Sequence, residues 1–327
     1  MTSSVLYATT HAGVALPVID VTNPAFRVAP TDAELAAMSE QYLIELARVQ
    51  EIPAAFREAL QRSALARALM AARDRFLGGM DTYLVKLGPD NLGADASQID
   101  RHIAGTFPAF SARLRLQDMA RMLADSLSLS IAAGPQRPVC LINIGGGPAS
   151  DSWNALICLH AAHSDLLAGR EITIAVMDVD DDGPAFGARA IETLCAPTAP
   201  LSGLHIEFRH FTYDWSEADR LGDVLDQLHA TGAACFVSSE GALFEYGSDA
   251  DIVSNLKMLN GGTAADTIVV GSVTRDGAPM RALETASRIS TRPRTIEAFR
   301  SLTEEAGWVV QESLERAFTY NLRLMKA

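Results

Sequence analysis

The sequence predicts an α/β fold, in which a mostly parallel seven-stranded sheet ends in an antiparallel hairpin and follows an all-helical region. Three observations support this prediction. Apolar residues recur at helical spacing over 31–134, short apolar runs alternate with helical segments after Pro138, and two strand-like runs are adjacent at the C-terminus. We therefore divide the chain into a flexible arm over 1–30, a helical domain over 31–136 and an α/β domain over 137–327.

The helical region opens at Thr31, where the order Thr-Asp-Ala-Glu is typical of a helix N-cap. Residues 52–80 continue at helical spacing and end at a Gly-Gly pair, which predicts a helix stop. Further helices are expected over 96–107 and 110–134, the last one ending at a Gly-Pro pair. We expect this region to form a lid over a substrate site or a surface for dimerisation.

The second half contains five apolar runs with the continuity of strands that are buried on both faces. Such strands, separated by helical segments, are typical of a parallel sheet with right-handed crossovers. The runs are residues 139–144, 172–179, 204–211, 233–239 and 267–273. After a final helix over 295–307, the runs 308–314 and 317–327 are too close together for a helical crossover, so they predict an antiparallel hairpin.

The composition limits the classes of partner. The chain has 327 residues and a formal net charge of −13, which argues against nucleic acid and against an anionic membrane surface. A small molecule is the expected partner, with a homodimer through the helical domain as a further expectation. The first twenty residues lack a signal-peptide pattern, and no apolar stretch reaches transmembrane length, so we expect a cytoplasmic protein.

The cysteines and histidines do not predict a metal site or a disulfide. No C-x-x-C pair occurs, and we expect the four cysteines to be reduced thiols. They are Cys140, Cys158, Cys195 and Cys235. His160 and His163 have helical spacing near one of them, but no second ligand cluster accompanies the pair, so we predict no metal. The acidic run 180–182 is interpreted as a solvated turn.

The segment LINIGGGPASDSWNAL, residues 141–156, places three glycines between a strand and a helix. Gly145, Gly146 and Gly147 allow a ligand to approach the backbone, and the following helix offers free N–H groups at its start. Ligands of open α/β sheets bind beyond the carboxyl ends of the strands. The corner therefore predicts a site for a nucleotide-like or charged small ligand, although a dinucleotide-binding fold uses a similar loop.

Three further features distinguish this corner from a dinucleotide site. The second strand ends at Asp178, the third ends in Tyr213-Asp214-Trp215, and the C-terminal helix and hairpin do not belong to a dinucleotide fold. Together they resemble the class I S-adenosylmethionine-dependent methyltransferase superfamily over about 139–327. The resemblance implies a Rossmann-like class I methyltransferase fold, with S-adenosylmethionine as substrate or methyl donor and no metal.

The resemblance also assigns roles to individual residues. Gly145 and Gly147 take the glycine positions of the motif, Asp178 the ribose-binding acid and Asp214 the adenine-side acid. The full cofactor-binding set that we predict is Asn143, Gly145, Gly146, Gly147, Ser150, Asp178, Tyr213, Asp214, Trp215 and Ser239. Two departures are evident: Asn143 replaces the usual acid at the end of the first strand, and the first crossover is long. Helix capping is the alternative role for Ser150.

The reaction is less constrained than the cofactor. The helical lid, together with INIGGGPASDS and SSEGALFEYGSD, loosely resembles azetidine-2-carboxylate synthases and their aziridine-forming relatives of natural-product biosynthesis. That resemblance implies that the amine of S-adenosylmethionine attacks its own γ-carbon and releases methylthioadenosine. The alternative is a methyltransferase acting on a small-molecule acceptor. A third interpretation is a non-catalytic S-adenosylmethionine-binding subunit that supports a partner enzyme.

Candidate catalytic groups lie at the carboxyl ends of the predicted strands. Glu240 and Tyr246 are the candidates for handling protons, and Asn143 for binding the amine. Glu240 has helix capping as its alternative role, and Tyr246 has packing beneath a loop. In the lid, we predict that a guanidinium group contacts the cofactor carboxylate or an acidic substrate. The candidates are Arg101, Arg113 and Arg115, and their alternative is pairing with the neighbouring Asp100 and Asp118.

Overall fold

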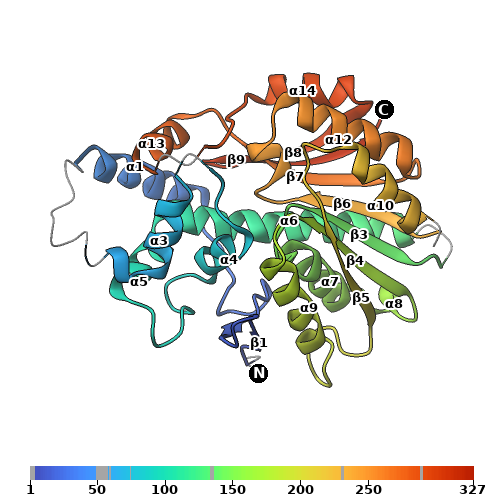
Figure 1. Ribbon diagram of the computed structural model, residues 1–327, viewed down its shortest axis with the longest axis horizontal. Coiled ribbons are helices and arrows are strands. Elements are labelled where there is room, and N and C mark those ends of the chain that lie inside the picture. The colour runs from blue at the N-terminus through green and yellow to red at the C-terminus, as the bar shows by residue number, and fades with distance from the viewer. Residues whose placement is uncertain are drawn as a thin grey trace.

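The computed structural model describes residues 4–48, 58, 60–73, 75–132, 136–229, 232–287 and 290–327. Its centre is a seven-stranded sheet with the order β5-β4-β3-β6-β7-β9-β8 (Figure 1). The strands are β3 (Val139–Ile144), β4 (Glu171–Asp178), β5 (His205–Thr212), β6 (Ala234–Ser239), β7 (Ile268–Thr274), β8 (Trp308–Glu315) and β9 (Thr319–Lys326). The first five are parallel, and β9 inserts antiparallel between β7 and β8. The predicted fold class is confirmed, including the C-terminal hairpin.

Helices cover both faces of the sheet, because alternate residues of its buried strands enter two separate cores. One core contains α6 (Phe107–Ala132), α7 (Ser150–Ala162) and α9 (Asp182–Leu194). The opposite core contains α10 (Asp219–His229), α12 (Asp249–Gly262) and α14 (Ile296–Glu305). Within β3, for example, Leu141 belongs to the first core and Ile142 to the second. This alternation explains why the strands are apolar throughout.

The helical region contributes α1 (Asp32–Arg48), α3 (Ala64–Ala71), α4 (Gly79–Leu87) and α5 (Gln98–Gly105), followed by α6. Its last helix packs against α7 and against β6, β7 and β9, so α6 belongs to the helical region and to the sheet layers at once. Two details differ from the prediction. The Gly-Gly pair at 78–79 begins α4 instead of ending a helix, and the long first crossover contains a second short helix, α8 (Ser164–Leu167). The Gly-Pro pair at 134–135 and residues 52–57 lie outside the described residues.

The prediction of a flexible arm over 1–30 is wrong for the described residues 4–30. They form a hairpin of β1 (Tyr7–Thr9) and β2 (Ala15–Pro17), and Ile19 beyond it is buried. The Ile19 N–H donates to the Tyr83 hydroxyl at 3.0 Å, and its carbonyl accepts from Trp153 Nε1 at 2.8 Å. Turn-forming residues interrupt any regular hydrophobic period in this segment. Its short apolar run VALPVIDV nevertheless buries several side chains, which holds the segment against the rest of the protein.

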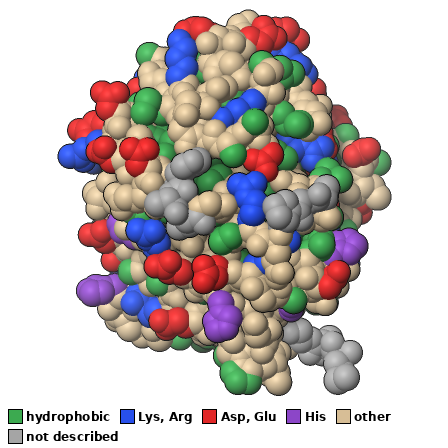
Figure 2. All heavy atoms as spheres, turned by 90° about the vertical axis from the view of Figure 1, so that its right-hand side faces the viewer, with side chains coloured by type: hydrophobic (Ala, Val, Ile, Leu, Met, Phe, Trp, Pro, Cys, Tyr) green, Lys and Arg blue, Asp and Glu red, His purple; other side chains and the backbone are tan. Residues whose placement is uncertain are grey.

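The other helices of the described residues are α11 (Leu243–Tyr246) and α13 (Ala278–Ser287), which follow β6 and β7. No helix in the described parts of the chain combines the length and hydropathy needed to cross a membrane. The face drawn in Figure 2 carries acidic, basic and apolar side chains side by side. On this face the acidic side chains are interspersed with the other types and do not gather in one patch.

The attachment of the N-terminal segment depends on one hydroxyl group. Tyr83 is 1% exposed, and its hydroxyl accepts from Ile19 N and donates to the Pro17 carbonyl at 2.7 Å. Tyr83→Phe leaves both backbone groups without partners, so we expect it to lower the free energy of unfolding by about 1–3 kcal/mol. Urea unfolding measures this change, with Tyr7→Phe, at a 58% exposed site, as the matched control. Equal stability of the two variants would contradict the assigned contact.

Candidate functional site

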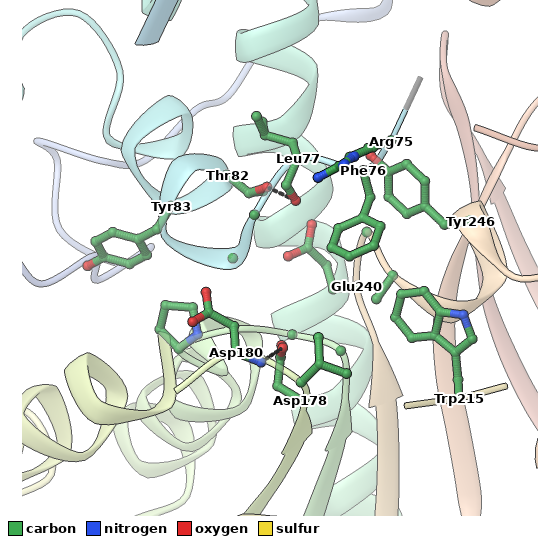
Figure 3. A pocket seen from close by; sticks show the side chains of 18 of the residues that line it. Arg75, Phe76, Leu77, Thr82, Tyr83, Asp178, Asp180, Trp215, Glu240 and Tyr246 are labelled. Atoms are coloured by element: carbon green, nitrogen blue, oxygen red, sulfur yellow. Dashed lines mark hydrogen bonds between the residues drawn. The ribbon is translucent and has the colours of Figure 1, made fainter. Parts of the chain in front are cut away.

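A cavity of about 420 Å³ lies at the carboxyl ends of the central strands (Figure 3). Its floor is the glycine corner, which we define as Gly145–Gly147, and its sides are the ends of β4, β5 and β6. The helical region closes it from the other side with residues 75–79 and the side chains of α4. We call this space the first cavity, and its volume lies in the range of small-molecule sites, roughly 300–1,000 Å³.

The glycine corner has a backbone shape that other residues adopt with difficulty. Gly145 and Gly147 have φ of +69° and +55°. A Cβ on Gly79, at the start of α4, would lie 2.7 Å from the Cα of Gly147. Helix α4 can therefore approach the corner only because both contacting residues are glycines. The contact also places the N-terminus of α4 beside the first cavity.

Several carboxylates line the cavity, and two of them lie at or just after the ends of β4 and β5. Asp178 is buried, and it accepts hydrogen bonds from Gly147 N at 2.8 Å and from Asp180 N at 3.0 Å. Burial raises the pKa of Asp178, and these two backbone donors partly offset the increase. Asp214 is exposed, and its Oδ1 accepts from Ser216 N and Ser216 Oγ at 2.9 and 2.8 Å. Both carboxylates retain lone pairs for a ligand.

Three aromatic rings from different elements meet at the cavity. The ring of Phe76, which precedes α4, lies 6.1 Å from the rings of both Trp215 and Tyr246 (Figure 3). Tyr213 also lines the cavity, but its hydroxyl donates to Asn255 Oδ1 at 2.5 Å. Phe76 is 48% exposed, although its two neighbours are partly buried. The helical region and the sheet domain therefore build one aromatic cluster, and aromatic faces attract cations.

A chain of four buried charges joins the lid to the sheet domain. Glu240, at the end of β6, forms ion pairs with Lys86 of α4 and with Arg115 Nε of α6, the latter at 2.5 Å. Arg115 Nη1 also pairs with Glu245 at 2.9 Å, and Ser272 Oγ donates to the same carboxylate at 2.6 Å. We call these groups, Lys86–Glu240–Arg115–Glu245, the charge chain. Its positive members come from the helical region and its negative members from the sheet domain.

The charge chain controls protonation at its two acids. Burial acts to raise the pKa of Glu240, but Lys86 and Arg115 reverse this effect and hold that pKa below its usual value. For Glu245, burial prevails and the pKa is raised. Burial also raises the pKa of Tyr246, and the charge of Glu245 adds to the increase. Glu240 is therefore ionised at neutral pH.

Asn143 lies beneath the glycine corner and does not line the first cavity. Its Nδ2 donates to Asp151 Oδ1 at 2.7 Å and to Ser238 Oγ at 3.1 Å. A Cβ on Gly146 would lie 1.8 Å from Asn143 Oδ1, so the corner folds directly over this side chain. Asn143 therefore supports the corner from below, and its Oδ1 is buried without a hydrogen-bond partner.

The other predicted residues fall into two groups. The first cavity is lined by Gly145, Gly146, Ser150, Asp178, Tyr213, Asp214, Trp215, Glu240 and Tyr246. Gly147 lies next to the cavity, since its N–H donates a hydrogen bond to Asp178. Ser239 is buried away from it, because its hydroxyl donates to the Ile144 carbonyl at 3.2 Å and accepts from Leu243 N at 3.1 Å.

None of the three predicted arginines of the helical region lines the first cavity, and each contacts other groups of the protein. Arg101 donates to the carbonyls of Pro89 and Gly93 at 2.8 and 2.7 Å, and Arg113 reaches the Phe26 carbonyl at 3.5 Å. Arg115 belongs to the charge chain. The two acids that were the alternative partners of these arginines have other contacts. Asp100 forms the capping box of α5 with Ser97, and Asp118 forms an ion pair with Arg316 at 2.8 Å.

Sequence reasoning missed Lys86 and Phe76. A signal existed for Lys86, since it stands alone in the apolar helical run TYLVKLG, where a charged residue needs a partner. No local pattern distinguishes Phe76 from an ordinary apolar residue. Within the described ranges, no group of three or more His, Cys, Asp or Glu side chains could hold a metal ion.

Comparisons with known proteins inform the fold. No family model and no curated protein matches the chain. A crystal structure described as a possible exported protein from Bordetella parapertussis superimposes with a TM-score of 0.57 at 19% identity, over 91% of this chain and 97% of that one. An O-methyltransferase family protein from Burkholderia thailandensis gives a TM-score of 0.44 at 14% identity, over 70% and 60%. The mitomycin 7-O-methyltransferase MmcR gives 0.41 at 14% identity, over 91% and 74%. The strand order β5-β4-β3-β6-β7-β9-β8, with β9 antiparallel, is by itself that of the class I methyltransferase fold, and a helical domain precedes the sheet.

Ionisation of Asp151, at the start of α7, lowers the stability of the folded protein. Burial raises its pKa to about 6, and the nearby charge of Glu240 contributes to the shift. Since this pKa lies above the unfolded value of about 3.9, the native state holds the proton more tightly. Stability is therefore lost as the pH rises from about 4 to about 6, and the cost above that range is about 3 kcal/mol at most.

We expect Asp151→Asn to remove this cost, because the amide oxygen can still accept from Asn143 and Ser152. Its stabilisation relative to the unmodified protein should be greater at pH 8 than at pH 5, by about 1–2 kcal/mol. Urea unfolding at the two pH values measures the difference, with Asp226→Asn at an exposed position of α10 as the control. An equal effect at both pH values would show that Asp151 does not titrate in this way.

Proposed function

We propose that the protein binds S-adenosylmethionine in the first cavity and transfers its methyl group to a small-molecule acceptor. The observation that carries this proposal is the convergence of three features on one cavity of about 420 Å³: the glycine corner with Asp178 bonded to it, the aromatic cluster, and the ionised Glu240. A nucleoside, a cation and an amino acid are the three parts of this cofactor. Each part meets a suitable group.

The side chains around the cavity fit these parts in turn. Asp178 uses two backbone donors and keeps lone pairs that can accept from a ribose diol. Asp214 offers its Oδ2 on the adenine side, since Oδ1 serves Ser216. The backbone of the glycine corner and Ser150 lie where the amino-acid part would bind.

When bound, S-adenosylmethionine supplies an electrophilic methyl carbon on a sulfonium. The rings of Phe76, Trp215 and Tyr246 favour a positive charge beside them, and the carboxylate of Glu240 adds a negative one. The lid, held by the charge chain, limits the access of water and restricts the positions that an acceptor can occupy. These residues thus bind and orient, and they do not need to exchange a proton.

Glu240 is a poor choice for the base that cyclisation of the cofactor would require. Lys86 and Arg115 engage its two oxygens and lower its pKa, so it has little affinity for an amine proton at neutral pH. For this reason we rank methyl transfer above the formation of azetidine-2-carboxylate. Tyr246 is no better suited as a base, because its raised pKa keeps the phenol protonated.

One observation favours cyclisation as a second candidate. Asp151 follows Ser150 of the cavity wall, its pKa is raised to about 6, and its Oδ2 is buried without a hydrogen-bond partner. A carboxylate with such a pKa matches the strength required of a general base near neutral pH. Asp151 would therefore be the group that takes the amine proton.

The products formed from S-adenosylmethionine distinguish these readings. We would incubate the purified protein with S-adenosylmethionine, alone and with a cell extract as the acceptor source, and identify the nucleoside by mass spectrometry. S-adenosylhomocysteine that appears only with extract supports methyl transfer. Methylthioadenosine that forms without extract, and faster than in a protein-free control, would contradict methyl transfer and support cyclisation. Binding without either product would indicate a non-catalytic subunit.

Asp178→Asn tests the cofactor site directly. The substitution preserves the size of the side chain but removes the charge that strengthens its hydrogen bonds to a ribose diol. We expect the affinity for S-adenosylmethionine, measured by isothermal titration calorimetry, to fall by about 10–100-fold, equivalent to about 1.5–3 kcal/mol. Asp226→Asn on α10 is the matched control, and it should bind as the unmodified protein does. Unchanged binding by the Asp178 variant would place the cofactor elsewhere.

A further inference from the structure

A second cavity of about 360 Å³ adjoins the first. It lies between the helical region and the C-terminal part of the sheet domain, with walls from α1, α5, α6, α13 and the turn between β8 and β9. Four residues line both cavities: Leu77, Thr82, Gly241 and Tyr246. We call these four the shared wall. The two cavities therefore meet at these residues, and ligands in them would be direct neighbours.

The second cavity is lined largely by apolar side chains, including aromatic rings. Tyr42 and Phe318 face it with ring centroids 6.0 Å apart, and Met280 and Leu114 lie nearby. Aromatic side chains favour a flat ligand that offers ring faces or edges. The composition thus fits a ring compound better than a sugar or a peptide.

The charged residues that line this cavity have partners already. Arg115 and Glu245 are members of the charge chain, and Arg316 pairs with Asp118 through two contacts at 2.8 and 3.1 Å. A charged ligand would have to compete with these buried pairs, at the cost of desolvating its own charge. The second cavity therefore favours an uncharged ligand.

One polar atom lacks a partner in this apolar surrounding. Thr274, the last residue of β7, lines the second cavity and is 2% exposed, and its Oγ1 has no hydrogen-bond partner. Among the described residues that line this cavity, Thr274 is the one with such a side-chain atom. Leaving a buried hydroxyl unsatisfied costs about 1–3 kcal/mol, and a ligand atom that bonds to it would recover that cost.

We propose that the second cavity is the acceptor site, and that it takes an uncharged, largely apolar ring compound whose polar group hydrogen-bonds to Thr274. This inference rests on the proposed methyl transfer and names its substrate class. In the reaction, a hydroxyl or amine of the acceptor forms a bond to the methyl carbon where the two cavities meet, beside the shared wall. The bond from sulfur to that carbon breaks, its electron pair stays on sulfur, and the acceptor's proton passes to water.

The test uses three probes in titrations without S-adenosylmethionine: 2-naphthol, naphthalene and 2-naphthoate. We expect 2-naphthol to bind about fivefold more tightly than naphthalene, because one neutral hydrogen bond contributes about 1 kcal/mol. The anionic 2-naphthoate should bind more weakly than 2-naphthol. Failure of both neutral probes to bind, or tighter binding of the anion, would overturn the proposal.

Thr274→Val keeps the shape of the side chain and removes its hydroxyl. In this variant we expect 2-naphthol and naphthalene to bind equally well, with the affinity for naphthalene unchanged. The matched control is Thr267→Val, which removes a second buried hydroxyl without a partner, also beside β7 but outside the cavity. Persistence of the fivefold preference in the Thr274 variant, or its loss in the Thr267 variant, would refute the role of Thr274.

The affinity for S-adenosylmethionine, measured separately on the same variants, keeps the two proposals distinguishable. Thr274→Val should bind the cofactor normally. Asp178→Asn should bind 2-naphthol normally while losing affinity for the cofactor. Cofactor binding without probe binding refutes the acceptor site alone, and probe binding without cofactor binding refutes the proposed function.

Discussion

The arrangement of the molecule depends on the charge chain. Its four members are almost fully withdrawn from water, and a buried charge is tolerated only beside a partner that offsets its lost hydration. Because Lys86 and Arg115 come from the helical region, and Glu240 and Glu245 from the sheet domain, both sets of elements must meet in one geometry. Gly241 is part of the same constraint, since a Cβ there would lie 2.5 Å from Arg115 Nη2. Gly241 also belongs to the shared wall, so this wall lies next to the charge chain.

The helical region therefore forms part of the site itself. Phe76 completes the aromatic cluster, Lys86 fixes the protonation state of Glu240, and Gly79 touches Gly147 of the glycine corner. A chain lacking the helical region would expose Glu240 without its two cations. The same helices also bound the second cavity, so the cofactor site and the proposed acceptor site are formed together.

The sequence predicts those features that depend on residues close together in the chain. The hairpin of β8 and β9 is predictable from two adjacent strand-like runs. The position of Asp178 beside the glycine corner is predictable because this residue ends a strand. Contacts between distant segments were not predictable in this way. Arg115 looked like a ligand-binding group but neutralises two acids, and Asn143 lies under the corner because the three glycines fold over it. The segment after β2 was mistaken for a flexible arm, since its partners Tyr83 and Trp153 lie far along the chain.

Hydrogen exchange measured by mass spectrometry, with and without S-adenosylmethionine, tests the central claim most directly. If the lid and the glycine corner hold one cofactor between them, exchange should slow in α4, over Gly79–Leu87, and at residues 145–153 at the same cofactor concentration. Protection at the corner without protection of α4 would contradict a site built from both parts. The absence of protection in either segment would contradict cofactor binding in the first cavity.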